Sequence, residues 1–145
     1  MGYTQASEFA MLQFYFLSIA LNALAGYILI AGDDVGVLEL KSSFSLKDET
    51  LRLVVGILSV ITGLLKILSP IEGDIPVVGD LIPALTGLLS GFILIFEYYR
   101  QRSTLEVTKH TDRIDRILVS NKRIIGVIAI IAAVLHFLFP KVLLL

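Results

Sequence analysis

The sequence contains no cysteine, which excludes disulfide bonds, thiolate nucleophiles and cysteine-ligated metal centres. It also lacks an excess of either charge: the formal net charge is −1. No overall field therefore attracts nucleic acid, and we expect no nucleic-acid partner. Residues 1–8 contain no lysine or arginine, whereas a cleavable signal peptide begins with a basic segment. We therefore expect the first apolar segment to be a retained membrane anchor.

Charged residues are almost missing from four long stretches. Three stretches contain none, and the fourth has Arg52 and Lys66 near its ends. In chain order the stretches are 9–30, 51–68, 81–96 and 124–139. A helix of ~20 apolar residues crosses the ~30 Å hydrocarbon core of a bilayer. The sequence predicts an all-α, polytopic membrane protein with one domain, 1–145, and four transmembrane helices. Their expected spans are 7–31, 50–69, 80–99 and 122–140.

Lysine and arginine are distributed unevenly among the connecting segments. Most of the 12 cations lie in or beside the first and third loops, whereas only Lys66 and Lys141 lie on the other side. Short loops rich in lysine and arginine stay in the cytoplasm. We therefore expect the first and third loops to be cytoplasmic and both termini to face outward. The predicted location is the plasma membrane of a bacterium or an archaeon, with the lipid bilayer as the first partner.

The first loop contains two local signals. Val35, Val37, Leu38 and Leu40 are apolar, and this segment predicts either a short strand or a segment at the membrane interface. Ser45 is followed by Leu-Lys-Asp-Glu, the pattern of a helix N-cap with acidic residues in the first turn. We therefore expect the second helix to begin near Leu46.

The third loop has a helical rather than a loop-like pattern. A seam with alternating spacings of four and three residues runs from the loop into the fourth span, and it predicts a continuous helix. The seam consists of Ile114, Leu118, Asn121, Ile125, Ile128, Ala132 and Leu135. We expect the third and fourth helices to extend into a cytoplasmic helical hairpin over 100–121; the alternative is an amphipathic helix lying on the membrane. Candidate contacts with a partner or lipid are Arg113, Arg116, Lys122 and Arg123.

The first span carries polar and small residues on one face. Ser18, Asn22 and Gly26 recur every four residues, and an amide in mid-membrane requires a polar partner. One interpretation is a stripe that packs against another helix. The other is the lining of a pore or an ion-binding site.

Two patterns of small residues predict close helix packing. They are Ser59 with Gly63 in the second span, and Gly87 with Gly91 in the third. Residues four positions apart lie on one helix face, where small side chains let two backbones approach closely. The predicted contact lies either between these two spans or between subunits.

The second loop and the outer end of the fourth span contain candidate ion ligands. Glu72, Asp74 and Asp80 would form an acidic ring at a pore mouth in an oligomer; alternatively, Asp80 caps a helix and the others are solvated. His136 with such carboxylates would suit a divalent cation, although no metal-ligand spacing supports this and the metal stays unknown. The alternative for His136 is a hydrogen bond to a neighbouring helix or to a carboxylate of this loop.

No catalytic or cofactor-binding pattern occurs in the sequence. There is no phosphate-binding loop, dinucleotide fingerprint, haem or flavin motif, or serine–histidine pair with an orienting acid in the membrane. We therefore expect a protein that is not an enzyme and needs no cofactor. The favoured function is a homo-oligomeric, passive channel-like or cation-binding membrane protein. The alternative is a non-conducting scaffold or accessory subunit that docks a protein partner through its charged hairpin.

Overall fold

The computed structural model describes residues 2–31, 48–68, 81–102, 113 and 115–139. They form four α-helices and one π-helical turn: α1 (Gly2–Ala31), α2 (Glu49–Leu68), α3 (Leu81–Arg102), η1 (Asp115–Val119) and α5 (Lys122–Leu138). No strand occurs within these ranges, so the predicted all-α class is confirmed. The segment 35–40 and Ser45 lie outside the described residues.

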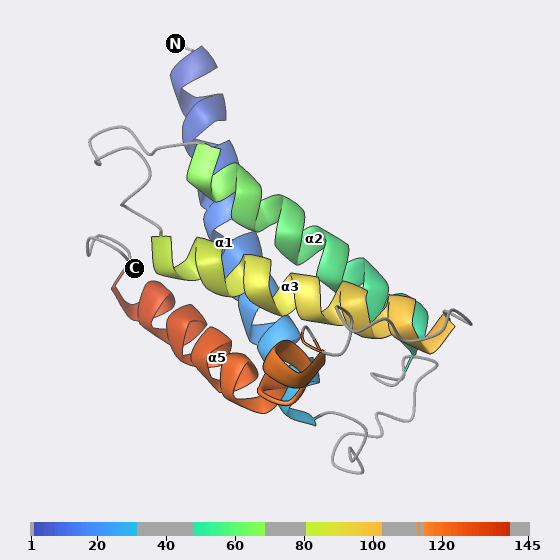
Figure 1. Ribbon diagram of the computed structural model, residues 1–145. Helices are drawn as coiled ribbons and strands as arrows, with labels where there is room; N and C mark the ends of the chain where they lie inside the picture. Colours follow the sequence, from blue (N-terminus) through green and yellow to red (C-terminus); the bar gives the residue numbers. More distant parts are fainter. Residues whose placement is uncertain (1, 32–47, 69–80, 103–112, 114, 140–145) are drawn as a thin grey trace, which may run out of the picture.

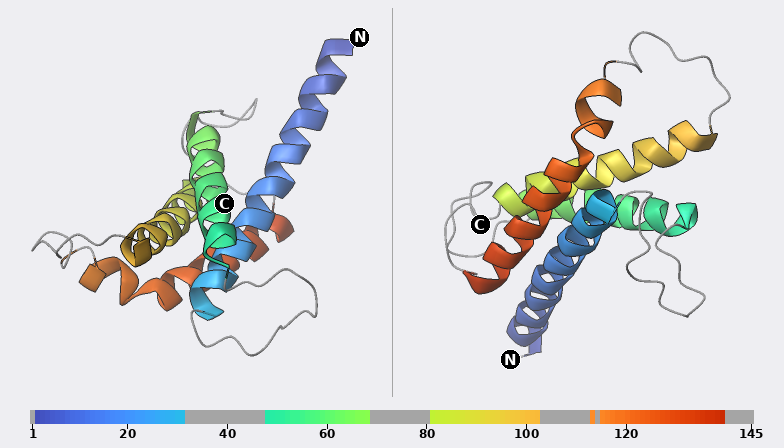
Figure 2. Two further views of the ribbon diagram at one scale, coloured as in Figure 1. Left: turned by 90° about the vertical axis from the view of Figure 1, so that its right-hand side faces the viewer. Right: turned by 90° about the horizontal axis from the view of Figure 1, so that it is seen from below.

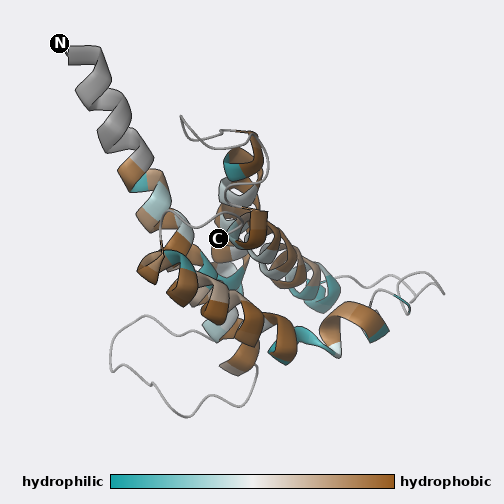
Figure 3. Ribbon diagram, turned by 90° about the vertical axis from the view of Figure 1, so that its left-hand side faces the viewer, coloured by the Kyte–Doolittle hydropathy of each residue, from teal (hydrophilic) through white to brown (hydrophobic). Residues whose placement is uncertain are grey.

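Three helices are long and apolar enough to cross a membrane: α1 over Leu12–Ala31, α2 and α3. α5 is equally apolar but has 17 residues. Large aliphatic and aromatic side chains are exposed on all four helices. Figure 3, which colours the ribbon by hydropathy, shows that hydrophobic residues, in brown, recur along these helices. Lipid, unlike water, solvates such a surface without cost, so the exterior suits a bilayer.

α2 begins three residues later than the sequence predicts. Asp48 caps the helix, because its Oδ1 accepts a hydrogen bond of 2.9 Å from the Thr50 backbone N–H. Asp48 itself is not helical, so the predicted start near Leu46 is wrong. An aspartate at this position also places negative charge beside the first turn, which the helix dipole favours.

The continuous helix predicted into the third loop is interrupted. Residues 115–119 form a π-helical turn, Ser120 and Asn121 form a turn, and α5 begins only at Lys122. The amide of Asn121 donates a hydrogen bond of 2.7 Å to the Ile117 carbonyl oxygen. This side chain satisfies a carbonyl that a regular helix would pair with a backbone N–H, so it stabilises the break. The hairpin tip at 103–112 lies outside the described residues.

The four α-helices pack as two antiparallel pairs. α2 lies along α3 and α1 lies along α5, whereas contacts between the pairs are less extensive. Figure 1 shows the first pair side by side, and the views in Figure 2 show that the two pairs cross. An apolar core of α1, α2 and α3 residues lies where the pairs meet. It consists of Ala25, Ile28, Leu29, Val55, Ile93 and Leu94.

The second pair of long helices repeats the first in sequence. The segment GYILI at 26–30 in α1 corresponds to GFILI at 91–95 in α3. The segment VVGILSVITGLLKIL at 54–68 in α2 corresponds to IIGVIAIIAAVLHFL at 124–138 in α5. All seven buried positions of α1, from Ser18 to Leu29, correspond to buried positions of α3. The chain therefore contains two copies of one helical hairpin, α1–α2 and α3–α5.

The geometry repeats as closely as the sequence. A Cβ built on Gly26 would lie 2.6 Å from the Gly126 carbonyl oxygen and 2.9 Å from Cγ1 of Ile130. A Cβ built on Gly91 would lie 2.6 Å from the Gly56 carbonyl oxygen and 2.9 Å from Cγ2 of Val60. In the repeat, Gly126 corresponds to Gly56 and Ile130 to Val60, so the two glycines meet corresponding residues at the same distances. α1 therefore packs on α5 as α3 packs on α2.

An approximate two-fold axis relates the two hairpins. A rotation about this axis places α1 on α3 and α2 on α5. It therefore places the α1–α5 pair on the α3–α2 pair. Corresponding residues should then meet on the axis, and they do: Lys66 of α2 contacts its counterpart His136 of α5. At the other end, Arg52 of α2 and its counterpart Lys122 both contact Glu97. Since each hairpin crosses the bundle twice, both copies run in the same direction along this axis.

Candidate functional site

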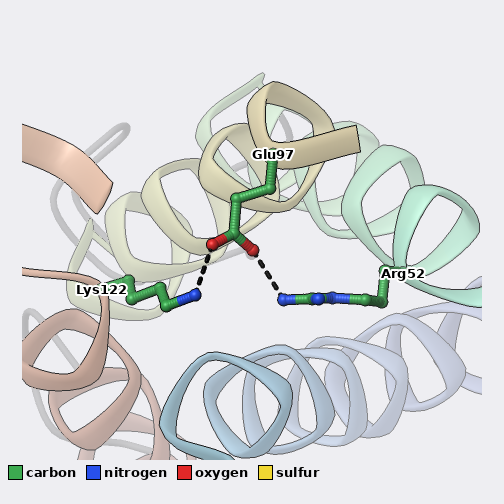
Figure 4. A network of polar contacts seen from close by, with 3 residues as sticks. All are labelled: Arg52, Glu97 and Lys122. Atoms are coloured by element: carbon green, nitrogen blue, oxygen red, sulfur yellow. Dashed lines mark hydrogen bonds and ion pairs between the residues drawn. The ribbon is translucent and has the colours of Figure 1, made fainter. Parts of the chain in front are cut away.

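Three charged side chains meet at one end of the bundle, here called the charged end: Arg52, Glu97 and Lys122. Glu97 Oε2 lies 2.6 Å from Nη2 of Arg52, and its Oε1 lies 2.6 Å from Nζ of Lys122 (Figure 4). The Glu97 side chain is only 10% exposed. Each oxygen of one carboxylate therefore serves a cation from a different helix, and the cluster links α2, α3 and α5. Sequence analysis did not associate Arg52 with this acid.

The cations predicted to contact a partner or lipid differ in their surroundings. Arg113, Arg116 and Arg123 are exposed. Lys122, in contrast, is half-buried and bound to Glu97, so its charge is directed into the protein. An exposed ion pair of 3.5 Å between Arg102 and Glu49 lies beside the cluster on α3 and α2. The charged end is therefore internally paired at its centre and basic at its rim.

The opposite end of the bundle, here called the histidine end, contains Tyr15, Lys66 and His136. Lys66 Nζ lies 2.7 Å from His136 Nε2, and the Tyr15 hydroxyl donates a hydrogen bond of 2.6 Å to the His136 carbonyl oxygen. The rings of Tyr15 and His136 lie 4.7 Å apart, and the Lys66 ammonium lies 5.9 Å from the tyrosine ring centre. His136 thus contacts neighbouring helices, which is the second of the two sequence interpretations.

The carboxylates predicted to join His136 are Glu72, Asp74 and Asp80, and all three lie outside the described residues. Within the described ranges, no group of three histidine, aspartate or glutamate side chains is close enough to hold a metal ion. His136 Nε2 faces an ammonium group instead, and a cation beside it opposes the binding of a second cation. A divalent metal at His136 therefore stays a prediction without structural support from this part of the chain.

A polar network lies midway between the two ends. The Asn22 amide donates a hydrogen bond of 3.0 Å to the Pro83 carbonyl oxygen, and the Thr86 hydroxyl lies 3.2 Å from Asn22 Oδ1. Ser90 directs its hydroxyl to the Thr86 carbonyl oxygen at 2.6 Å. Asn22 is 2% exposed and Ser90 is fully buried. The amide that sequence analysis placed in mid-membrane therefore finds its partner on α3.

A narrow gap adjoins this network between α1, α2 and α3, and it is here called the polar gap. It is lined by Ser18, Leu21, Asn22, Ser59, Thr62, Gly63, Pro83 and Gly87. The gap is too tight to admit a water molecule. The Ser59 hydroxyl, in a residue that is 1% exposed, has no hydrogen-bond partner within the described residues. Ser18 and Asn22, two of the predicted pore-lining residues, thus face the interior of one chain.

The small residues predicted to promote packing lie between α2 and α3 of the same chain. A Cβ on Gly63 would lie 2.9 Å from the Ala84 carbonyl oxygen, and one on Gly87 would lie 3.4 Å from the Ser59 carbonyl oxygen. Gly91 and Gly56 approach each other more closely still. Gly26, predicted to share a face with Asn22, packs instead on Gly126 of α5.

Sequence analysis missed several residues of these clusters. They are Tyr15, Arg52, Gly56, Thr62, Thr86, Ser90 and Gly126. The internal repeat is a signal that would have found some of them. Aligning 54–68 with 124–138 pairs Gly56 with Gly126 and Lys66 with His136, which predicts that these positions share one environment.

Comparison with other proteins identifies a family. A protein-family model matches residues 11–136, which include the described parts of all four α-helices from Met11 onward. An uncharacterized protein of Treponema pallidum (strain Nichols) is 36% identical over 133 residues. The matched region covers 92% of this chain and 98% of that protein. No solved structure matches the chain. The chain therefore belongs to the protein family represented by this Treponema pallidum protein and by the model that spans residues 11–136.

Proposed function

We propose that all four α-helices cross a membrane. α5 has 17 residues, at the short end of the range for helices that cross a bilayer, and it corresponds position by position to α2, which is long and apolar enough. Side chains exposed on α5 are isoleucine, valine, leucine and phenylalanine along its central turns. Corresponding helices in two copies of one hairpin should have the same surroundings, so the helix that matches a spanning helix should span as well.

The proposed topology can be tested by labelling single cysteines, because the natural chain has none to remove. We expect Ser120→Cys, in the turn before α5, to react with a membrane-impermeant maleimide only after cells are opened. Ser69→Cys, after α2, should react in intact cells. The readout is the fraction of protein labelled. Labelling of both positions from the same side would contradict the proposed topology, because a single crossing, that of α3, separates these two loops.

We propose further that the protein is a passive, cation-binding membrane protein, and that its site lies inside each chain. The exposed side chains in the central turns of the helices are apolar, whereas the polar ones are buried. A pore between copies needs polar groups on the surfaces that face it. Cation binding in the polar gap needs no ring of subunits. Assembly into a homo-oligomer stays a prediction, and native mass spectrometry of the complex tests it.

The observation that carries this proposal is a difference between the two copies of the hairpin. Ser59, Thr62 and Gly63 of α2 correspond to Ala129, Ala132 and Ala133 of α5. The α5 residues are buried in the corresponding interface, so alanine suffices for packing there. The hydroxyl groups on α2 are therefore not required by the fold. Polar groups inside a membrane protein are costly, and their usual role is in an ion or substrate path.

Ion flux through the purified protein tests the proposal. In proteoliposomes under a cation gradient, we expect Asn22→Leu to reduce flux by at least roughly tenfold, since it replaces the central amide by an apolar side chain. Leu24→Ala, on the exposed face of the same helix, is the matched control and should leave flux unchanged. Flux in Asn22→Leu equal to that of the unmodified protein would refute a path through the polar gap.

A second candidate function is a non-conducting scaffold that docks an acidic partner. It is favoured by the exposed Arg113 and Arg116 at the rim of the charged end. Charges that face solvent at one end of a rigid bundle are available to a partner. This candidate would replace the first if no cation flux were detected and if charge reversal of Arg113 and Arg116 abolished co-purification of a cytoplasmic protein.

A further inference from the structure

We infer that the polar gap is a binding site for a single dehydrated monovalent cation of about the size of sodium. This inference rests on the proposed cation function and specifies the ion and its ligands. The proposed ligands are Asn22 Oδ1 and the hydroxyl oxygens of Ser18, Ser59 and Thr62. They come from α1 and α2, and α3 closes the gap with Pro83 and Gly87.

The lining groups have the chemistry that suits a monovalent cation. The polar side chains among them are an amide and hydroxyls, and no carboxylate of the described residues lines the gap. Calcium and magnesium usually need carboxylate ligands to offset the cost of losing their hydration shell. Among the described residues, the lining also contains no titratable side chain.

The hydrogen bonds around the gap favour a cation over an anion. The Asn22 amide nitrogen donates to the Pro83 carbonyl oxygen, which leaves Oδ1 directed toward Thr86 and Gly87. Ser90 likewise directs its hydroxyl hydrogen to a backbone carbonyl oxygen of α3. These two donors are thus engaged with backbone acceptors. An anion would therefore not find the Asn22 amide N–H or the Ser90 O–H, whereas the oxygen lone pairs of the lining residues can bind a cation.

Ser59 supplies an independent observation. Ser59 lines the gap, and its hydroxyl is buried, yet that hydroxyl has no hydrogen-bond partner in the described part of the chain. Buried polar groups are nearly always satisfied, so an unsatisfied one that faces a gap indicates a ligand. The corresponding residue of the other hairpin is Ala129, whose side chain has no polar group that needs a hydrogen-bond partner.

The tightness of the gap selects among monovalent cations. A water molecule does not fit, and a potassium ion is about as large as water. A dehydrated sodium ion is smaller than either. Because the helices around the gap are held together by backbone contacts at Gly63 and Gly91, the gap cannot widen easily for a larger ion.

Thermal unfolding of the full chain in nanodiscs tests the site. In choline chloride at constant ionic strength, replacing choline by sodium should raise the unfolding midpoint in a saturable manner, because a ligand that binds only the native state stabilises it. Potassium should have little effect. Ser59→Ala and Thr62→Val should each weaken the apparent sodium affinity by roughly tenfold or more. Ser90→Ala is the matched control: it removes a buried hydroxyl that does not line the gap, so it should retain the sodium response.

The midpoint of unfolding tests the sodium site, and the flux measurement tests the proposed function, so the two can fail independently. An equal response to sodium, potassium and choline, or an unchanged sodium response in Ser59→Ala, would overturn the inference. If Ser59→Ala did not fold, Thr62→Val would decide in its place. Sodium flux without a sodium-dependent midpoint would refute the site and leave the passive cation function standing. A sodium-dependent midpoint without flux would support the site and refute the passage of ions.

Discussion

Replacing Glu97 by glutamine is expected to destabilise the protein by about 3–5 kcal/mol, because it removes the acid that two buried cations share. Arg52 and Lys122 would then lie close together in a low-dielectric interior with no carboxylate between them. Glutamine has nearly the same shape as glutamate, so the loss reflects charge rather than packing. The measurement is the free energy of unfolding in detergent, from a denaturant titration followed by circular dichroism.

Two further variants isolate the cause of this effect. Lys122→Met removes one cation and leaves Arg52 paired with Glu97, so it should cost less than Glu97→Gln. Added to Glu97→Gln, it should recover part of the lost stability, as expected for groups in one network. Glu49→Gln breaks the exposed pair with Arg102 and should cost no more than about 1 kcal/mol. If Glu97→Gln cost as little as Glu49→Gln, the cluster would contribute nothing to folding.

Replacing Gly26 or Gly91 by alanine is expected to destabilise the bundle, by about 1–3 kcal/mol for each variant. Each new methyl group would lie 2.6 Å from a carbonyl oxygen of the facing helix, so the backbones must separate. In an isolated helix the same change is stabilising by about 1 kcal/mol. A loss of stability therefore reports the helix contact rather than helix propensity. The readout is the same unfolding titration.

The two-fold repeat adds a quantitative condition to this prediction. Gly26 and Gly91 meet corresponding atoms at equal distances, so their alanine variants should have similar costs. Gly87→Ala is the control, since its nearest contact is 3.3 Å, to a side-chain oxygen. A stabilised Gly26→Ala beside a destabilised Gly91→Ala would contradict equivalent packing of the two helix pairs.

Several features of the fold follow from the sequence because they depend on local pattern. Long uncharged stretches predict the apolar helices, and each of the four stretches overlaps one of the observed α-helices. Pro83 lies in the first turn of α3, where its missing N–H has no helical partner to lose. The start of α2 was misplaced because Ser45 and Asp48 are both good N-caps, and sequence pattern alone does not rank them.

The residues of the polar clusters illustrate what the sequence leaves open. Lys122 is one of several cations after α3, and nothing local distinguishes it from Arg123. Its position on α5 turns it toward Glu97, whereas Arg123 is exposed. Asn22 had two interpretations, and its hydrogen bond to Pro83 depends on how α1 crosses α3. Such choices depend on helix packing, which brings together residues far apart in the chain.

By itself, the sequence determined the helical class, the apolar character of the helices and the absence of thiol chemistry, since each depends on composition or on neighbours along the chain. It also contained the repeat, as the matching segments at 26–30 and 91–95 show. Only the tertiary structure decided which helices pair, that Glu97 joins Arg52 to Lys122, and that Ser59 faces a gap. The physical reason is that close packing depends on the shapes of surfaces distant in sequence, and small residues allow it without specifying the partner.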